Sequence, residues 1–327
     1  MQTNRRVAIT AVTVGVVAIL LNVVSFAADF PGVRSVAAIE GTQSVTLPAQ
    51  RDLYRPPAAP DFLSQLSTRQ VYVSVESPVQ FPLLRYHADE QVPLASLTKL
   101  TSALVALSLH PDWEKSVTIL ASDRRVGAQQ HVYAGEVVTM RDLWTLLLVG
   151  SDNDAVIAFI RGLDIPEADF VAKMNELANA MHLTDTTFIE PTGLAPGNIS
   201  TAREYAVIAR RAFAEPLIAD PLKQAEAAIV VSGKTRRVYS TDQELKGDAL
   251  PPHSWHYVTG KTGFIEESGY NVVVLANDGE NGEVLAVVLG SANVLSRAED
   301  ASQLFDWALG IVKTMPKGET IGNRLLY

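Results

Sequence analysis

The chain has 327 residues and contains no cysteine. This absence excludes a disulfide framework and any metal site built from thiolate ligands. The histidines are scattered, and no two of them form a His-x-x-x-His or His-Glu-x-x-His pattern. Because zinc hydrolases commonly use such spacings, we do not expect a metal hydrolase, and we expect no other cofactor.

Positive charge is also scarce. The formal net charge is −9, and no stretch is rich in lysine or arginine. Proteins that bind nucleic acids usually present a basic patch to the phosphates, so nucleic acid is not an expected partner. The pattern Gly-x-Ser-x-Gly, which marks the nucleophile of many Ser-His-Asp hydrolases, is missing as well.

The N-terminus reads as an export signal. Arg5 and Arg6 precede an uncharged apolar stretch over residues 7–28, and residues 25–27 (Ser-Phe-Ala) fit a cleavage site. The stretch is also long enough to cross a bilayer, so a retained anchor is the alternative. We therefore expect residues 1–28 to be a signal peptide or a membrane anchor. In either case the body of the protein lies in the periplasm or cell envelope, and a retained anchor would attach it to the inner membrane.

The composition changes twice along the rest of the chain. Residues 29–68 contain several prolines and little periodicity, which predicts an extended linker or an arm lying on the domain. From there to residue 314 the pattern is that of a folded domain, 47% of the whole chain being apolar. We therefore predict one domain over residues 69–314 and a C-terminal tail over residues 315–327.

Strand patterns open and close this domain. Residues 71–76 alternate between polar and apolar, and residues 270–276 and 284–289 are apolar runs joined by a turn-rich hairpin. Helical patterns lie between them, and residues 297–314 form an amphipathic helix. This order predicts an α+β fold, with an antiparallel sheet flanked by helices and a helical subdomain.

Ser96 and Lys99 form a Ser-x-x-Lys pattern directly before an apolar helical run. At the start of a helix, free N–H groups and the helix dipole favour negative charge near Ser96. Lys99 lies one turn further on the same face, and a buried amine can lose its proton near neutral pH and act as a base. Alone, the pattern is short, and a helix cap with a surface lysine explains it as well.

Two further motifs follow. Ser151 and Asn153 lie at a junction between helices, where a hydroxyl and a carboxamide can relay a proton and hold a substrate amide, although helix capping is the alternative. Lys261, Thr262 and Gly263 precede the hairpin. Small residues there let a substrate backbone lie along the strand, and the lysine supplies a cation for a carboxylate. The alternative is a glycine-rich turn with a surface lysine.

The three motifs together resemble the penicillin-recognising serine acyltransferases. They are most similar to the low-molecular-mass penicillin-binding proteins, the serine-type D-Ala-D-Ala peptidases. The resemblance covers roughly residues 71–306 and includes residues 188–194 (Phe-Ile-Glu-Pro-Thr-Gly-Leu). It implies a β-lactamase/transpeptidase-like fold, and it makes residues 69–314 a penicillin-binding peptidase domain.

The resemblance implies a D,D-carboxypeptidase or endopeptidase that acts on peptidoglycan stem peptides, with β-lactams as inhibitors. Ser96 would attack the substrate carbonyl, Lys99 would take its proton, and Ser151 would pass a proton to the leaving amine. An acyl-enzyme on Ser96 would follow, and water would release it.

The remaining residues of the site would bind the substrate. The resemblance implies that Asn153 holds a substrate amide, while Lys261 and Thr262, followed by Gly263, receive the carboxylate end. Backbone N–H groups of Ser96 and Phe264 would form the oxyanion hole, a role that does not depend on the side chain.

Two other functions remain open at this point. A class A-like β-lactamase would need a glutamate to activate water, and Glu190 is the candidate, but residues 192–194 (Thr-Gly-Leu) fit the peptidases instead. A catalytically inactive cell-wall-binding protein would be favoured by a damaged motif, and none is damaged.

The balance between carboxypeptidase and endopeptidase activity is also open, although the Glu-Pro-Thr-Gly-Leu segment and the short C-terminus resemble the endopeptidase branch. Residues 239–257 depart from the family pattern. In that region His253, Trp255 and His256 either contact substrate or are explained by burial or by a solvated loop.

Overall fold

The computed structural model describes residues 58–77, 80–127, 130–247, 249–280 and 282–314. The predicted signal or anchor, the first part of the predicted linker and the predicted C-terminal tail lie outside these ranges. No helix within the described ranges is long and apolar enough to span a membrane. The domain boundaries drawn from the sequence stay predictions.

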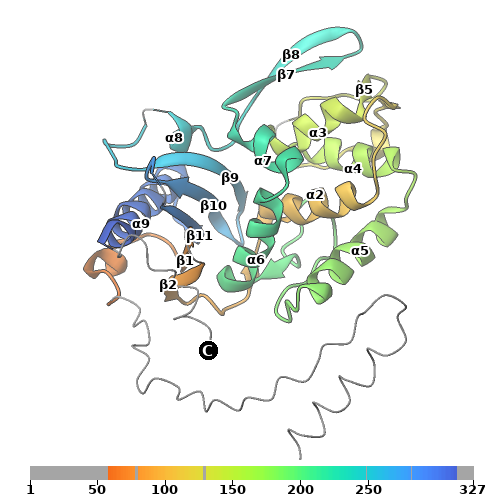
Figure 1. Ribbon diagram of the computed structural model, residues 1–327. Helices are drawn as coiled ribbons and strands as arrows, with labels where there is room; N and C mark the ends of the chain where they lie inside the picture. The colour runs from red at the N-terminus through yellow and green to blue at the C-terminus, as the bar shows by residue number, and fades with distance from the viewer. Residues whose placement is uncertain (1–57, 78–79, 128–129, 248, 281, 315–327) are drawn as a thin grey trace, which may run out of the picture. The chain divides into compact units, whose positions relative to one another are not determined.

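A five-stranded antiparallel sheet forms the centre of the domain (Figure 1). Its strand order is β2-β1-β11-β10-β9. The strands are β1 (Gln70–Ser77), β2 (Phe81–Tyr86), β9 (His256–Ile265), β10 (Gly269–Asn277) and β11 (Glu283–Ser291). The first and last strand regions pair in antiparallel orientation, with Val73 opposite Ala286.

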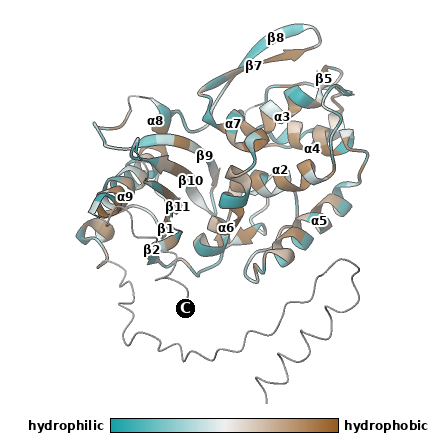
Figure 2. Ribbon diagram, viewed as in Figure 1, coloured by the Kyte–Doolittle hydropathy of each residue, from teal (hydrophilic) through white to brown (hydrophobic). Residues whose placement is uncertain are grey.

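Both faces of this sheet are buried, which explains why its strands are nearly continuously apolar. Val71, Val73 and Val75 belong to one core cluster, together with residues of α9 (Val294–Thr314). Tyr72, between them in β1, belongs to the other cluster, which includes α2 and α6 residues. Side chains alternate between the faces of a strand, so each apolar neighbour enters a different core. Figure 2 shows the hydrophobic residues along these strands and helices.

The predicted helical subdomain is present. The remaining helices are α2 (Thr98–Ser108), α3 (Met140–Leu148), α4 (Asn153–Gly162), α5 (Glu167–Ala180), α6 (Ala202–Phe213), α7 (Pro216–Lys223) and α8 (Gln243–Lys246). Thr139 caps α3, because its hydroxyl accepts a hydrogen bond from the backbone N–H of Asp142 (3.1 Å). Thr201 caps α6 in the same way, because its hydroxyl accepts a hydrogen bond from the backbone N–H of Glu204 (3.1 Å).

Between α7 and α8 the chain forms a hairpin. It belongs to a four-stranded sheet in the order β4-β5-β7-β8. The short elements are β3 (Val92–Pro93), β4 (Ser116–Thr118), β5 (Val137–Thr139), β6 (Ile199–Ser200), β7 (Glu226–Val231), β8 (Lys234–Tyr239), η1 (Asp61–Gln65), η2 (Ala95–Leu97) and η3 (Ala121–Asp123). Val138 of β5 pairs with Val231 of β7, and next to this pair the backbone N–H of Ser232 donates a hydrogen bond to the Val137 carbonyl (2.8 Å).

Trp255 is buried, with 1% of its surface exposed. Its Nε1 donates a hydrogen bond to Ser302 Oγ (3.1 Å), and its ring packs on Phe305. The burial alternative is therefore confirmed for this tryptophan, which packs against α9. His253 stacks on its ring, with 4.0 Å between the centroids, while His256 starts β9 with an exposed side chain.

The part of the predicted linker that the structure describes, residues 58–68, lies against the domain. Phe62, Leu63 and Leu66 pack against the core cluster under α9. Ser67 donates two hydrogen bonds to the carboxylate of Asp300, from its backbone N–H (3.1 Å) and from its hydroxyl (2.8 Å). These contacts attach the segment to the α9 side of the sheet.

Candidate active site

Ser96 and Lys99 lie side by side at the junction of η2 and α2. Ser96 is partly exposed in η2, and Lys99 is fully buried in the first turn of α2. One helical turn separates them, and Lys99 Nζ lies 2.8 Å from Ser96 Oγ. The Ser-x-x-Lys spacing thus places an amine in hydrogen-bond contact with a hydroxyl that solvent can reach.

The other contacts of Lys99 Nζ decide which way its lone pair faces. The nitrogen lies 2.6 Å from Asn153 Oδ1 and 2.7 Å from the carbonyl oxygen of Thr192. Both oxygens only accept hydrogen bonds. A neutral amine that donates its two hydrogens to them keeps its lone pair directed at Ser96 Oγ. The arrangement therefore suits an amine that takes a proton from Ser96.

Burial also prepares Lys99 for this role. Burial lowers the pKa of the Lys99 amine to about 7, although the nearby carboxylates of Glu190 and Asp152 favour its charged form. An amine with a pKa near the working pH is present in part as the free base. At neutral pH a substantial fraction of the molecules can use Lys99 as a base.

The Thr192 carbonyl is held in place by Glu190. The Glu190 carboxylate accepts hydrogen bonds from the backbone N–H groups of Thr192 (2.7 Å) and Gly193 (2.5 Å) and from Asn198 Nδ2 (2.8 Å). Gly193 has a φ of 91°, and a Cβ there would lie 1.9 Å from the Ala95 carbonyl oxygen. Only glycine fits such a position. The Glu-Pro-Thr-Gly-Leu segment thus supplies one of the acceptors that orient Lys99.

Ser151 occupies the turn between α3 and α4. Its φ is 54°, an uncommon conformation for a residue with a side chain, and such strained positions concentrate at functional sites. Asp152 is the N-cap of α4, since its side chain accepts a hydrogen bond from the backbone N–H of Ala155 (2.9 Å). The structure therefore brings Ser151 and Asn153 to the two lysines, with Asp152 between them as the helix cap.

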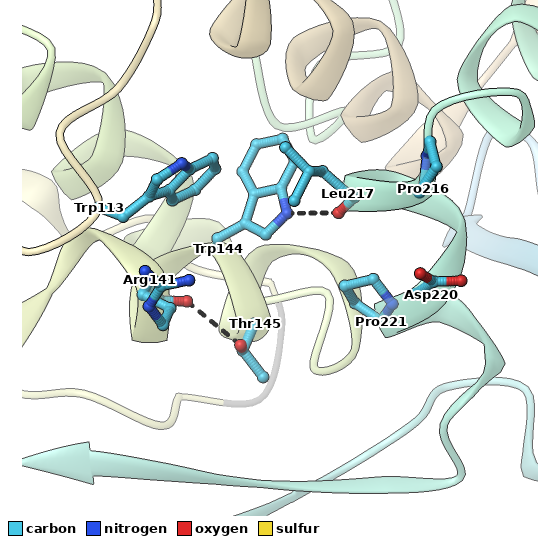
Figure 3. Close-up of a pocket in the computed structure, with 8 residues that line it drawn as sticks. All are labelled: Trp113, Arg141, Trp144, Thr145, Pro216, Leu217, Asp220 and Pro221. Carbon is cyan, nitrogen blue, oxygen red and sulfur yellow. Dashed lines mark hydrogen bonds between the residues drawn. The ribbon is translucent and has the colours of Figure 1, made fainter.

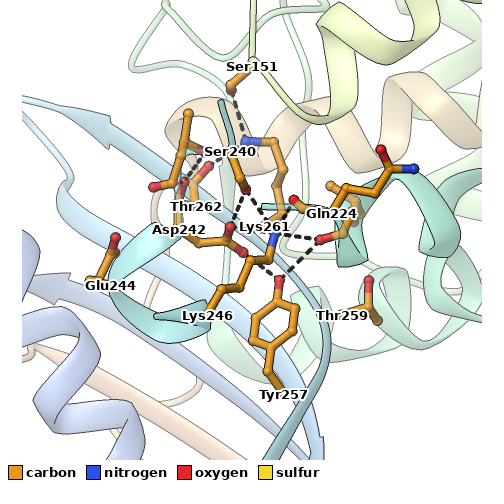
Figure 4. Close-up of polar contacts among 12 residues, drawn as sticks. Ser151, Gln224, Ser240, Asp242, Glu244, Lys246, Tyr257, Thr259, Lys261 and Thr262 are labelled. Atoms are coloured by element: carbon orange, nitrogen blue, oxygen red, sulfur yellow. Dashed lines mark hydrogen bonds and ion pairs between the residues drawn. The ribbon is translucent and has the colours of Figure 1, made fainter. Parts of the chain in front are cut away.

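Lys261 joins the third motif to the second. It is buried on β9, and its Nζ donates hydrogen bonds to Ser151 Oγ (2.8 Å) and to the Thr262 carbonyl (2.9 Å), as Figure 4 shows for Ser151. Burial, together with the positive charge of Lys99, holds the pKa of Lys261 well below its usual value. An anion that reached this amine would restore its charge.

Gly263 lets β9 run directly against the segment that carries Ser96. A Cβ on Gly263 would lie 2.9 Å from the backbone nitrogen of Ser96 and 3.0 Å from the Leu94 carbonyl oxygen. Backbone atoms at this distance cannot give way, so a larger residue would push the strand off. Asn271 of β10 strengthens the same contact by donating to the carbonyls of Pro93 (3.1 Å) and Leu94 (3.2 Å).

Thr262 has polar neighbours that no sequence motif indicated. Its Oγ1 lies 2.6 Å from Thr241 Oγ1, in the segment between β8 and α8. This segment is fixed by Asp242, which is buried, forms an ion pair with Lys246 (2.7 Å) and accepts a hydrogen bond from Tyr257 (Figure 4). Thr241, Asp242 and Lys246 are not part of any of the three motifs, so only the fold reveals their contact with the site.

Arg297 of α9 is a second residue that the sequence reading missed. It is buried, forms an ion pair with Glu244, and its Nη2 lies 3.4 Å from the Thr241 carbonyl oxygen. Its positive charge contributes to the lowered pKa of Lys261. The Arg297 guanidinium is thus a buried positive charge next to the segment whose Thr241 contacts Thr262.

A separate cavity of about 210 Å³ lies between α3 and α7 (Figure 3). Trp144 closes one side through a hydrogen bond from its Nε1 to the Leu217 carbonyl (2.7 Å), and Trp113 forms another wall. None of the residues that line it belongs to the three motifs. The candidate catalytic groups therefore lie elsewhere, around Ser96.

Comparison with known families gives a match over most of the domain. The family model described as D-alanyl-D-alanine carboxypeptidase matches residues 70–293. The chain belongs to this family. Membership confirms the predicted family and the predicted enzyme class, that of a serine-type peptidase.

Curated relatives of this D-alanyl-D-alanine carboxypeptidase family member include endopeptidases. The chain is 30% identical to D-alanyl-D-alanine endopeptidase of Haemophilus influenzae over 59% of its own length, and it spans 65% of that protein. It is 28% identical to D-alanyl-D-alanine endopeptidase of Escherichia coli K12 over 70% of its length and 73% of that protein.

A solved structure agrees with the predicted fold. D-Alanyl-D-alanine carboxypeptidase from Mycobacterium tuberculosis H37Rv is 27% identical with a TM-score of 0.66, covering 81% of this chain and 97% of that one. The predicted transpeptidase-like α+β fold is thereby confirmed. Within the described ranges, no three histidine or acidic side chains gather as metal ligands would.

Proposed function

We propose that this protein is a serine D,D-peptidase that acts on peptidoglycan stem peptides through an acyl-enzyme on Ser96. The observation that carries this proposal is the environment of Lys99. Its amine is buried, its two N–H groups have carbonyl acceptors, and its lone pair is left for the Ser96 hydroxyl. This is the arrangement that an activated alcohol nucleophile requires.

The first chemical step follows from this geometry. Ser96 Oγ attacks the carbonyl carbon of the terminal D-Ala or cross-link bond, and its proton moves to Lys99 Nζ 2.8 Å away. The carbonyl oxygen becomes negative and receives hydrogen bonds from the backbone N–H groups of Ser96 and Phe264. Gly263 allows the strand to approach closely enough for both groups to face one oxygen.

The leaving group departs on the side of Ser151 and Lys261. When the carbon–nitrogen bond breaks, the amine needs a proton, which passes from Lys99 through the Ser151 hydroxyl. Lys261 and Thr262 bind the carboxylate of the departing residue, and Asn153 orients the acyl amide. A water molecule then attacks the ester carbon and gives its proton to Lys99, which has been neutral since the amine left. As the ester bond breaks, this proton passes to Ser96 Oγ, the acid product leaves, and the enzyme returns to its starting state.

A class A-like β-lactamase is disfavoured by the engagement of Glu190. The Glu190 carboxylate accepts hydrogen bonds from the backbone N–H groups of Thr192 and Gly193, so both of its oxygens are already engaged within its own loop. A general base for deacylation would need a free oxygen facing water. When a β-lactam acylates Ser96, its ring opens but its leaving group stays bonded to the acyl part, so it remains in the site, hinders the attack of water and inhibits the enzyme.

We also infer export to the periplasm or cell envelope from residues 1–28. The paired arginines and the apolar run that follows support this. N-terminal sequencing of the protein from envelope fractions distinguishes cleavage after Ala27 from a retained inner-membrane anchor.

Incubation with benzylpenicillin is the first test of the proposed function. Intact-mass measurement is expected to show one added penicilloyl group, and peptide mapping should place it on Ser96. Purified muropeptides ending in D-Ala-D-Ala, and cross-linked dimers, are then expected to be cleaved, and the faster reaction decides between carboxypeptidase and endopeptidase. Rapid penicillin turnover without an adduct would favour a β-lactamase, and neither adduct nor cleavage would favour a wall-binding protein.

The rate of acylation is expected to depend on pH through Lys99. The base form of Lys99 grows as pH rises through about 7, where burial has placed its pKa. The second-order rate constant for benzylpenicillin acylation should therefore increase about tenfold per pH unit below that value and level off above it. Stopped-flow measurements from pH 5.5 to 9 test this. A rate that is flat across this range would exclude Lys99 as the base.

A further inference from the structure

A second cleft lies where β9 ends, next to the candidate active site. Its volume is about 540 Å³, and its walls include Arg69, Phe264, Glu266 and Tyr270. Phe264 follows Gly263, the residue whose backbone touches the Ser96 segment. The cleft therefore begins on β9 one residue beyond Gly263, the point where this strand lies against the Ser96 segment.

Two opposite charges face this cleft without a partner in the described part of the chain. Arg69 and Glu266 both line it, and both have exposed side chains with no ion pair or side-chain hydrogen bond there. The aliphatic stem of Arg69 is fixed by Gly290, since a Cβ at Gly290 would lie 2.9 Å from Arg69 Cγ and Cδ. Because the stem packs on Gly290 while the residue remains exposed and lines the cleft, its charged end is available to a ligand.

The walls of the cleft are already built. Phe264 and Tyr270 stack with 4.3 Å between their centroids and 28° between their planes, and 46% of Phe264 remains exposed. On the other wall, the hydroxyls of Ser67 and Ser291 both donate to the buried Asp300 carboxylate (2.8 and 2.9 Å). A ligand would meet a preformed surface, which keeps the entropy cost of binding low.

The direction of the substrate follows from the proposed function, on which this inference rests. The leaving residue lies toward Lys261 and Thr262, and the attacked carbonyl lies at Ser96. The acyl part of the substrate must then continue the other way along β9, past Phe264 toward Glu266. The residue before the acyl D-alanine is the one whose side chain reaches this cleft.

We propose that the cleft formed by Arg69, Phe264, Glu266 and Tyr270 binds the side chain of this residue and selects one that ends in an ammonium and a carboxylate on the same carbon. The Arg69 guanidinium forms an ion pair with the carboxylate of the ligand, and the Glu266 carboxylate accepts hydrogen bonds from its ammonium. The stacked rings of Phe264 and Tyr270 cover the methylene groups between that end and the peptide backbone. A side chain with an ammonium alone would satisfy only one of the two charges.

Two synthetic stem peptides ending in D-Ala-D-Ala test this selectivity. One carries meso-diaminopimelate before the acyl D-alanine, and the other carries L-lysine, which has the ammonium but lacks the carboxylate. We expect kcat/KM of the wild-type protein to favour the diaminopimelate peptide about tenfold, the usual effect of one added charge-assisted hydrogen bond. Released D-alanine is measured for both.

Two variants separate the two charges. Arg69→Gln is expected to remove most of the preference between the peptides, because only the diaminopimelate peptide uses the guanidinium. Glu266→Gln is expected to lower kcat/KM for both peptides and to keep their ratio, since both carry the ammonium. A general loss of structure would not produce these two different patterns.

The chain offers matched controls on the same sheet and turn. Arg85→Gln and Glu267→Gln also remove one exposed charge each, outside the cleft, and should leave the ratio as in the wild type. Equal kcat/KM for the two peptides, or a ratio that Arg69→Gln does not change, overturns this inference alone. A wild-type protein that hydrolyses neither peptide and forms no penicilloyl adduct overturns the proposed function together with it.

Discussion

Replacement of Ser96 by alanine is expected to abolish both peptide hydrolysis and penicillin labelling. Ser96 Oγ is the atom that would carry the acyl group, and its contact with Lys99 Nζ at 2.8 Å makes it the activated hydroxyl of the cluster. Removal of a nucleophile that acts as a unit with its base typically lowers kcat by about 10⁴- to 10⁶-fold. Released D-alanine and intact mass after benzylpenicillin report the two losses.

A matched serine on the same helix controls for this substitution. Ser108 ends α2, and its hydroxyl donates a hydrogen bond to the Val105 carbonyl within the same helix (2.7 Å). Ser108→Ala should keep the activity of the wild type. Ser96 is partly exposed, so Ser96→Ala should change the free energy of unfolding by less than about 1 kcal/mol. Hydrolysis that survives in Ser96→Ala would move the nucleophile to another residue.

The parts of this site that the sequence predicted are those that depend on short-range geometry. Ser96 and Lys99 are separated by one helical turn, which alone brings their side chains into contact. The hairpin of β10 and β11 and the alternation of β1 likewise follow from local patterns. Local patterns do not indicate that Ser151 and Lys261, which are 110 residues apart in sequence, lie in contact. That expectation came from the order of the three motifs along the chain.

The parts that sequence reasoning missed depend on backbone atoms and long-range packing. The Thr192 carbonyl orients Lys99, but a carbonyl group belongs to every residue and leaves no pattern. The same holds for the left-handed conformation of Ser151, which the fold imposes. Thr241 reaches Thr262 only because Asp242 is anchored by Lys246 and Tyr257. Such a network can be recognised only after the chain has folded.

Buried charge shows how stability and function oppose each other in this site. Lys99 and Lys261 are both fully buried, and burial lowers the pKa of each. Two neighbouring buried amines lower the stability of the folded protein, since each disfavours the charge of the other and apolar side chains would carry no such cost. The proposed function would account for their presence, with Lys99 as the base and Lys261 as the group that binds the substrate's carboxylate.

Replacement of Lys261 by methionine tests that explanation, because methionine retains the length of the aliphatic stem and removes only the amine. We expect kcat/KM for D-Ala-D-Ala peptides to fall about 10²- to 10³-fold, the usual effect of losing one group that stabilises developing charge. KM should rise as well, since in the proposed mechanism the same amine binds the substrate carboxylate. Steady-state kinetics with stem peptides measure both effects.

Thermal unfolding of the same variant separates this role from a structural one. Lys261→Met removes an amine whose charge burial disfavours, so its melting temperature should equal or exceed that of the wild type. Lys234 lies exposed on β8, and Lys234→Met should leave the kinetics unaltered. A Lys261→Met protein that melts earlier and hydrolyses peptides normally would mean that the lysine holds the Ser151 turn to β9 and takes no part in recognition. Lower activity in an equally stable protein would instead show that the buried charge is maintained for the substrate, at a position where folding alone would favour an apolar residue.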